Sequence, residues 1–280
     1  MPTPTTFDRR PARLPLYLRA ALPHRGTTVP GRAFRLEGTR TDVRHVSEYA
    51  RLCGFTVRAA LPLTYPHLLG FPLQMAVLAQ RDFPFSATGL VHIGNRIEQR
   101  RAVGVHEPLD VEVHASGPDP HPRGRTVHLH TAVSVGGEVV WTSSSTYLRR
   151  GGGVGNAPAA DVEVADDLPT TAVWRLPADL GRRYAAVSGD LNPIHLNRFA
   201  AKAFGFPRTI AHGMWSAAAC AATLEGRLPD AVVYEASFRA PVLLPSTVEL
   251  ASRADRSGAD LLLRSPSGRA HLRGRVTAAG

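Results

Sequence analysis

Apolar positions along this chain of 280 residues recur either with the helical period of about 3.6 residues or with the strand period of two. Helical segments are followed by strand segments twice, once in each half of the chain. In the second half, Leu180, Tyr184 and Val187 recur at helical spacing within 177–188, and a longer helix is predicted from about 213 to 225. Residues typical of strands then follow, in the segments 231–238, 248–253, 260–264 and 270–277. The pattern predicts an α+β fold in which helices face an antiparallel sheet.

The first half repeats this order. Helices are predicted over 42–53 and around 73–78, where apolar residues form one face. Strands should follow, in the segments 87–97, 110–116, 126–135 and 138–148. Gly136-Gly137 is typical of a hairpin turn between the last two. The opening segment through about Arg32 is rich in proline and arginine, and we expect it to be irregular, draped on the surface or partly ordered by the second half.

Sequence identity between the halves indicates a duplication. Tyr49–Gly54 aligns with Tyr184–Gly189, and Gly70–Pro72 aligns with Gly205–Pro207, each pair separated by 135 residues. The sequence therefore predicts two copies of one unit joined by a glycine-rich linker. The predicted boundaries are 1–150 for the first copy, 151–170 for the linker and 171–280 for the second copy.

The segment 188–195 of the second copy, Ser-Gly-Asp-Leu-Asn-Pro-Ile-His, combines a helix end with an acid and an imidazole. Gly189 can form a left-handed cap, and Asn192-Pro193 is a turn dipeptide that should prevent the helix from resuming immediately. We therefore expect the chain to bend back and bring Asp190 close to His195. Such a pair can exchange protons with a substrate. The alternative is structural, because Asp, Asn and Pro are ordinary turn residues and a His after a turn is often a surface or core group.

This octet, followed by Gly205–Pro207 and Ile210–Met214, resembles the signature of the MaoC-like hydratase/dehydratase family, which includes (R)-specific enoyl-CoA hydratases. The resemblance extends more loosely through Phe238–Val242 to Leu250 and so covers the second half. It implies a hotdog fold and, with the duplication, a double hotdog in which one continuous antiparallel β-sheet wraps two central helices.

The family also implies an activity. A hydro-lyase of this kind reversibly hydrates trans-2-enoyl thioesters and dehydrates (3R)-3-hydroxyacyl thioesters in fatty-acid or related acyl metabolism. The acyl group is carried by coenzyme A (CoA) or by acyl-carrier protein (ACP). Two alternatives remain open: a hotdog thioesterase that hydrolyses an acyl thioester, and a non-catalytic acyl-binding subunit.

By the same resemblance, Asp190 and His195 are the catalytic acid/base pair, and Gly213 provides a backbone N–H for the thioester oxygen. An N–H at a helix N-terminus is an unpaired donor, which suits this role. The alternative for Gly213 is close packing of the helix on the sheet. His212 can cap or pack the helix start, so we leave it outside the catalytic set.

Three further residues of the octet, Ser188, Gly189 and Asn192, are predicted to contact substrate or orient the loop. The amide of Asn192 can bond both to the backbone and to Asp190.

The first copy lacks these groups. Phe55, Val57 and Ala60 stand opposite the acid, the amide and the imidazole of the second copy. Since neither Phe nor Ala transfers protons near neutral pH, one active site per chain is predicted, with the first copy shaping the substrate cavity. His67 is interpreted as structural.

Composition limits the partners. The formal net charge is +10, but arginines are dispersed and Lys202 is the sole lysine, so we predict no nucleic-acid surface. A positive field favours a phosphate-bearing substrate such as CoA. Apolar runs are too short for a membrane span, and no export signal is visible, which indicates a cytoplasmic protein.

No cofactor or metal is expected, because Asp190, His195 and His212 do not form a convincing metal triad in the sequence. Cys53 and Cys220 are interpreted as buried small apolar residues. The chain is predicted to be a monomer, in effect a pseudo-dimer, or a homodimer.

Overall fold

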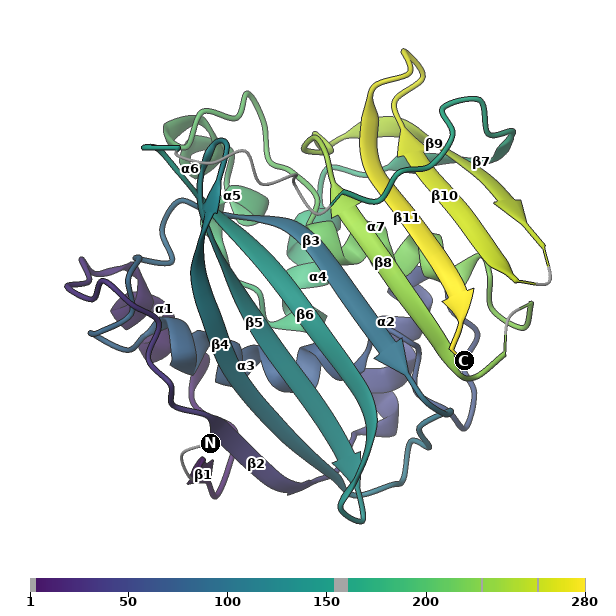
Figure 1. Ribbon diagram of the computed structural model, residues 1–280. Helices are drawn as coiled ribbons and strands as arrows, with labels where there is room; N and C mark the ends of the chain where they lie inside the picture. Colours follow the sequence, from purple (N-terminus) through teal and green to yellow (C-terminus); the bar gives the residue numbers. More distant parts are fainter. Residues whose placement is uncertain (1–3, 154–160, 228, 256, 280) are drawn as a thin grey trace. The chain divides into compact units, whose positions relative to one another are not determined.

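The computed structural model describes residues 4–153, 161–227, 229–255 and 257–279. The chain divides into two compact units (Figure 1). Unit 1 comprises Met1–Thr41, Pro66–Ile97 and His106–Asp161, and unit 2 comprises Asp42–Tyr65, Glu98–Val105 and Val162–Gly280. Each unit is described separately below.

In unit 1 a twisted sheet packs against one central helix. Its strands lie in the order β1-β2-β4-β5-β6-β3, and β2, β4, β5 and β6 pair antiparallel. The strand bounds are β1 Thr5–Phe7, β2 Phe34–Thr39, β3 Leu90–Gln99, β4 Leu109–His121, β5 Gly124–Val135 and β6 Glu138–Arg150. Gly136 and Gly137 have φ of 57° and 86° in the β5–β6 hairpin, so the predicted turn is confirmed.

Helix α3 (Pro66–Leu78) is the central helix of unit 1 and lies against β4 and β5 (Figure 1). All thirteen of its residues are buried, including the polar His67 and Gln74. The Gln74 amide donates to the Thr131 hydroxyl at 3.0 Å. We predicted one apolar face for this helix, but every face of it is buried, because the helix is enclosed on all sides.

The expectation for the opening segment was wrong in part: residues 22–33 are irregular, as predicted, but a strand and a helix precede them. The segment contains β1, which pairs parallel with β2, and helix α1 (Arg13–Ala21), which packs on α3. Tyr17 lies 6.4 Å from Phe71 between ring centroids, and Ala20 is fully buried. The segment is thus ordered within unit 1, because a few apolar residues at helical spacing offset its proline and arginine content.

Unit 2 has the same plan. Its strands lie in the order β8-β11-β10-β9-β7, and each neighbouring pair is antiparallel. The bounds are β7 Thr170–Leu176, β8 Val232–Phe238, β9 Ser246–Ala254, β10 Gly258–Arg264 and β11 Ala270–Ala278. The prediction located four of these strands and missed β7. The central helix is α7 (Gly213–Ala222), which is buried from Met214 to Ala221.

The helix predicted over 42–53 is α2 (Val43–Cys53). The Asp42 carboxylate accepts the Arg44 N–H at its start, and Gly54 ends it at φ 87°. Although α2 comes from the first half of the sequence, it belongs to unit 2 and packs on α4 (Leu180–Ser188) and α7. Unit 2 therefore includes two segments of the first half of the sequence, Asp42–Tyr65 and Glu98–Val105, whereas unit 1 ends at Asp161.

The predicted linker, 151–170, includes residues 154–160, which lie outside the described residues. The boundary between the two units falls within the predicted linker, since Asp161 ends unit 1 and Val162 begins the last segment of unit 2.

Each unit consists of a mainly antiparallel sheet around one buried helix, α3 or α7. The predicted double hotdog is confirmed. Both cysteines are free and buried, as predicted. Within the described ranges, every helix is too short or too polar to cross a bilayer.

Candidate active site

The end of helix α4 positions the acid. Gly189 adopts φ 74° and ψ 9°, and its N–H donates to the Ala185 carbonyl at 2.8 Å. This is the predicted left-handed cap, which a residue with a Cβ adopts only with strain. The backbone therefore leaves the helix axis immediately before Asp190.

Side chains of the octet then stabilise the turn. The Asp190 N–H donates to Ser188 Oγ at 3.1 Å, and the Asn192 N–H donates to Asp190 Oδ1 at 3.1 Å. Asn192 Oδ1 accepts the Ile194 N–H at 3.4 Å. Asn192 thus contacts Asp190 through its backbone, whereas we predicted contact through its side-chain amide. For Ser188, Gly189 and Asn192 the structure shows roles in the turn, and contact with substrate stays a prediction.

Helix α4 does not resume at Asn192-Pro193, as predicted, but a separate short helix that we did not predict begins there. Pro193 is the first residue of the short helix α5 (Pro193–Leu196), and Asn192 is its N-cap. Proline suits this position because its missing N–H is not needed in a first turn. Helix α6 (Arg198–Ala203) follows directly.

Close packing of α5 on α4 returns His195 toward the acid. A Cβ on Gly181 of α4 would collide with the His195 carbonyl oxygen, so only glycine permits this approach. Asp190 and His195 each present a ligand atom within 4.8 Å of the other. The predicted proximity is confirmed. The need for Gly181 was missed, because its partner is a backbone atom of another helix.

His195 is buried, with 8% of its surface exposed. Its Nδ1–H donates to the Ile210 carbonyl at 2.8 Å. A carbonyl can only accept, so the neutral ring carries its proton on Nδ1 and keeps a lone pair on Nε2. Burial lowers the pKa of His195, and Asp190 and the Ile210 hydrogen bond oppose this shift in part. The neutral form is therefore favoured, with Nε2 available as a base.

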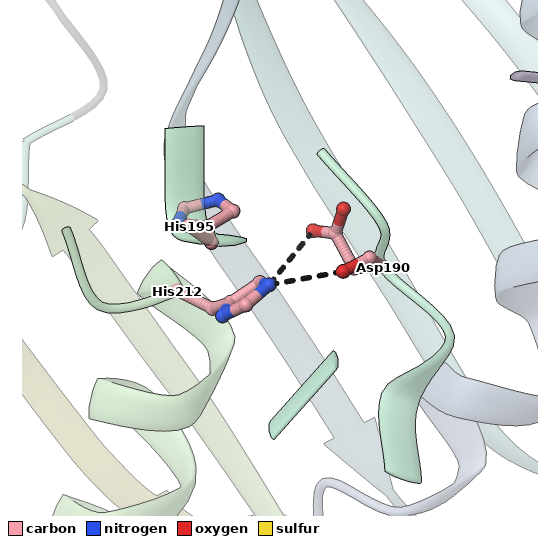
Figure 2. A group of neighbouring side chains, drawn as sticks. All are labelled: Asp190, His195 and His212. Atoms are coloured by element: carbon pink, nitrogen blue, oxygen red, sulfur yellow. Dashed lines mark hydrogen bonds and ion pairs between the residues drawn. The ribbon is translucent and has the colours of Figure 1, made fainter. Parts of the chain in front are cut away.

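His212 lies in the same cluster, a proximity that we did not predict (Figure 2). Its ring stacks on His195 with centroids 3.6 Å apart, and its Nε2 lies 3.2 Å from Asp190 O and 3.9 Å from Asp190 Oδ2. His212 is the N-cap residue of α7, but its side chain makes no capping hydrogen bond. Burial, and then the neighbouring His195, lower its pKa to about 3. The ring therefore stays neutral, and it packs against both His195 and the backbone of Asp190.

Asp190, His195 and His212 lie close enough together to raise the question of a metal ion, since one ligand atom from each falls within 4.8 Å of the others. The sequence did not predict that these three side chains lie so close together. The two rings lie in planes only 25° apart, however, so an ion between them would sit out of both ring planes, whereas imidazole binds metals in its plane. That no metal is required stays a prediction.

Gly213 begins helix α7, as predicted. A Cβ at this position would lie 3.1–3.2 Å from the ring of Phe238 on β8, so the packing explanation for this glycine is supported. Its N–H is in the first helical turn, where no intrahelical acceptor exists. The role in binding the thioester oxygen is compatible with this packing and stays a prediction.

The first-copy residues that align with Asp190 and His195, and His67, nearby in the sequence, make packing and backbone contacts. Phe55 is buried and stacks on Tyr49 with centroids 6.5 Å apart, and Ala60 forms a β-bridge with Gly104. In unit 1, His67 is buried in α3 with its ring 6.5 Å from that of His92. These contacts agree with the prediction that none of the three takes part in chemistry.

Two hollows of about 500 and 870 Å³ lie in unit 1, beside α1 and residues 79–82. Neither is lined by the residues of the Asp190 cluster. The substrate cleft beside that cluster stays a prediction.

Acidification should destabilise the protein through the buried imidazoles. Their pKa values lie below 6.5 in the folded state, at about 3 for His212, and return to about 6.5 on unfolding. The unfolded chain then binds more protons, so this stabilisation is complete above about pH 6.5 and is lost as the pH falls toward the folded pKa. We expect the urea midpoint to fall between about pH 7 and pH 4, and to fall less in His212→Gln. Equal acid sensitivity of the two proteins would contradict this explanation.

Unit 2 thus brings together a carboxylate that follows α4, an imidazole of α5 and the imidazole that precedes α7, with one ligand atom of each within 4.8 Å of the others. A sequence profile described as "MaoC like domain" matches residues 154–259. The chain is also 42% identical over 263 residues to 3-hydroxyacyl-thioester dehydratase X of Mycobacterium tuberculosis (strain ATCC 25618 / H37Rv), an alignment covering 91% of this chain and 94% of that protein. The chain therefore belongs to the MaoC-like family, as the octet implied.

Solved structures agree. The crystal structure of HtdX from M. tuberculosis matches with a TM-score of 0.79 and 41% identity, covering 89% of this chain and all of the other. A second M. tuberculosis protein, described as having a double hotdog fold, matches with a TM-score of 0.55 over 90% of this chain and 98% of its own. At 14% identity it supports the fold alone.

Proposed function

We propose that the protein is a hydro-lyase that hydrates trans-2-enoyl thioesters and, in reverse, dehydrates (3R)-3-hydroxyacyl thioesters. The observation that carries the proposal is the Asp190 carboxylate within 4.8 Å of a buried, neutral imidazole, at a turn that side-chain hydrogen bonds stabilise. Membership of the MaoC-like family and 42% identity to a named 3-hydroxyacyl-thioester dehydratase support the assignment.

The reaction needs two proton transfers and a place for negative charge. In hydration, the oxygen of water forms a bond to C3 and loses a proton to the Asp190–His195 pair. The pair delivers one proton to C2, so both groups end in their initial state. As water attacks C3, the π electrons of the C2–C3 bond move toward the thioester, which gains enolate character. The Gly213 N–H stabilises the negative charge that develops on the thioester oxygen.

The hydrogen bonds of the site prepare these steps before substrate arrives. The Ile210 carbonyl holds the tautomer of His195 in which Nε2 is a base. The Asn192 N–H occupies Oδ1 of Asp190 and restricts rotation of the carboxylate. His212 contacts the backbone oxygen of Asp190 and stacks on His195, so it limits movement of both groups. The catalytic pair is therefore pre-positioned, and little reorganisation is required.

The thioester carrier is CoA or an acyl-carrier protein in this proposal, and no cofactor is needed. The net charge of +10 favours either phosphate-bearing carrier. The (R) configuration and the cytoplasmic location are part of the proposal and follow from the family resemblance and the sequence.

A spectrophotometric assay with purified protein and enoyl-CoA substrates of increasing chain length, starting with crotonyl-CoA, tests the function. Hydration removes the conjugated double bond, so absorbance of the enoyl thioester should fall without release of free thiol. Release of thiol from acyl-CoA with crotonyl-CoA left unchanged would indicate a thioesterase. Binding of enoyl-CoA without turnover, and without any effect of Asp190→Asn on that binding, would indicate a silent acyl-binding protein.

A further inference from the structure

His45 of helix α2, in the first half of the sequence, bonds the end of helix α4 within unit 2, directly before the turn 188–192 that carries Asp190. Its Nε2 lies 2.8 Å from the carbonyl oxygen of Val187, and its Nδ1 lies 2.8 Å from the hydroxyl of Tyr65. The imidazole is half-buried, whereas the Tyr65 side chain is 1% exposed. Both ring nitrogens of His45 are therefore engaged inside the unit.

The chemistry of the two partners fixes the direction of these hydrogen bonds. A carbonyl oxygen only accepts, so the Nε2–H of His45 donates to Val187. In the neutral ring Nδ1 is then an acceptor, and the Tyr65 hydroxyl donates to it. The His45 ring lies nearly edge-on to Tyr65, at 67° between planes and 5.7 Å between centroids. Tyr65 thereby holds His45 in the tautomer and orientation that the Val187 carbonyl requires.

Val187 occupies a sensitive position, because it is in the last turn of α4. The final carbonyls of a helix lack intrahelical partners and need hydrogen-bond donors from elsewhere. His45 supplies the donor for Val187, and the next residue, Ser188, accepts the N–H of Asp190 through Oγ. Hydrogen bonds thus connect Tyr65 through His45 to the Val187 carbonyl, and the residue that follows Val187 bonds the Asp190 N–H.

Helix α2 is itself fixed against the two helices that carry the site. Tyr49 is fully buried, bonds the Thr64 hydroxyl at 2.8 Å and lies 6.3 Å from the ring of Tyr184 on α4. The Trp215 indole of α7 donates to the Leu52 carbonyl at 3.3 Å. His45 therefore projects from a rigid element, which is what a positioning group requires.

We infer that His45 is a positioning residue of the active site: its hydrogen bond to Val187 fixes the end of α4 and, with it, the orientation of Asp190. This inference rests on the proposed function. It also gives the first half of the duplicated sequence a role besides packing, because the copy without the acid and imidazole supplies the helix that orients the acid in the other copy.

Two substitutions test the inference. His45→Leu removes both hydrogen bonds, whereas His45→Gln retains a donor near the position of Nε2. We expect His45→Leu to lower kcat about tenfold, the scale of one hydrogen bond, with KM changed less than about twofold. His45→Gln should recover kcat to within about threefold of the wild type. Ser47→Ala is the matched control: within the described part of the chain the Ser47 hydroxyl donates to the Val43 carbonyl of α2 alone, so the variant should keep wild-type kcat.

Hydrogen–deuterium exchange of the folded proteins separates positioning from catalysis. The amides of Asp190 and Asn192, which the turn protects, should exchange about tenfold faster in His45→Leu and at the wild-type rate in Ser47→Ala. Unchanged exchange at these amides, or equal loss of kcat in the Leu and Gln variants, would overturn the inference. If the wild type hydrates no enoyl thioester, the proposed function fails, and the exchange comparison still decides the role of His45.

Discussion

Asp190→Asn should reduce the turnover of enoyl thioester hydration by about a hundredfold or more, the usual scale for the loss of an acid/base group. Asparagine has nearly the same shape, and its Oδ1 can still accept the Asn192 N–H, so the turn should persist. The amide cannot take a proton from water near neutral pH. Single-turnover and steady-state assays of the purified variant measure the effect, and circular dichroism with thermal melting checks the fold.

Asp179→Asn is the matched control for this substitution. Asp179 is a half-buried residue at the start of the same helix, and its carboxylate makes no capping hydrogen bond. The control should retain wild-type turnover. Near-normal turnover in Asp190→Asn would contradict the mechanism, and so would equal losses in the two variants.

His195→Ala should likewise lower turnover by about a hundredfold or more. The imidazole is the partner of Asp190 in proton transfer, and its Nε2 lone pair has no substitute in the alanine variant. Stability should also fall, by about 1–3 kcal/mol, because the buried Ile210 carbonyl loses its donor. Kinetics below the melting temperature, together with urea unfolding, separate the two effects.

His67→Ala provides the comparison for this loss. It removes a buried imidazole from unit 1, so it should cost stability without a comparable loss of turnover. If His67→Ala reduced turnover as strongly as His195→Ala, the first copy would have a catalytic role that we have not assigned. If His195→Ala remained nearly as active as the wild type, the pair would not be the acid/base group.

Local features of the chain were predictable because they depend on few neighbouring residues. The left-handed cap at Gly189, the hairpin at Gly136-Gly137 and most strands follow from glycine conformations and from the alternation of side chains. The strand β7 and helix α1 were missed, because their short apolar patterns are diluted by exposed or basic residues. The dipeptide Asn192-Pro193 is compatible both with a turn and with an N-cap followed by proline at the first helical position. In the structure it begins helix α5.

The amino-acid sequence by itself determined the duplicated plan, the asymmetry between a copy with an acid and imidazole and a copy without them, and the bend that joins Asp190 to His195. Only the tertiary structure decided that His212 completes the cluster, that α2 packs in unit 2 and that His45 bonds the end of α4. The reason is physical. Caps, turns and periodicity act over a few residues, whereas stacking, side-chain hydrogen bonds and the close approach at Gly181 join elements that no local pattern relates.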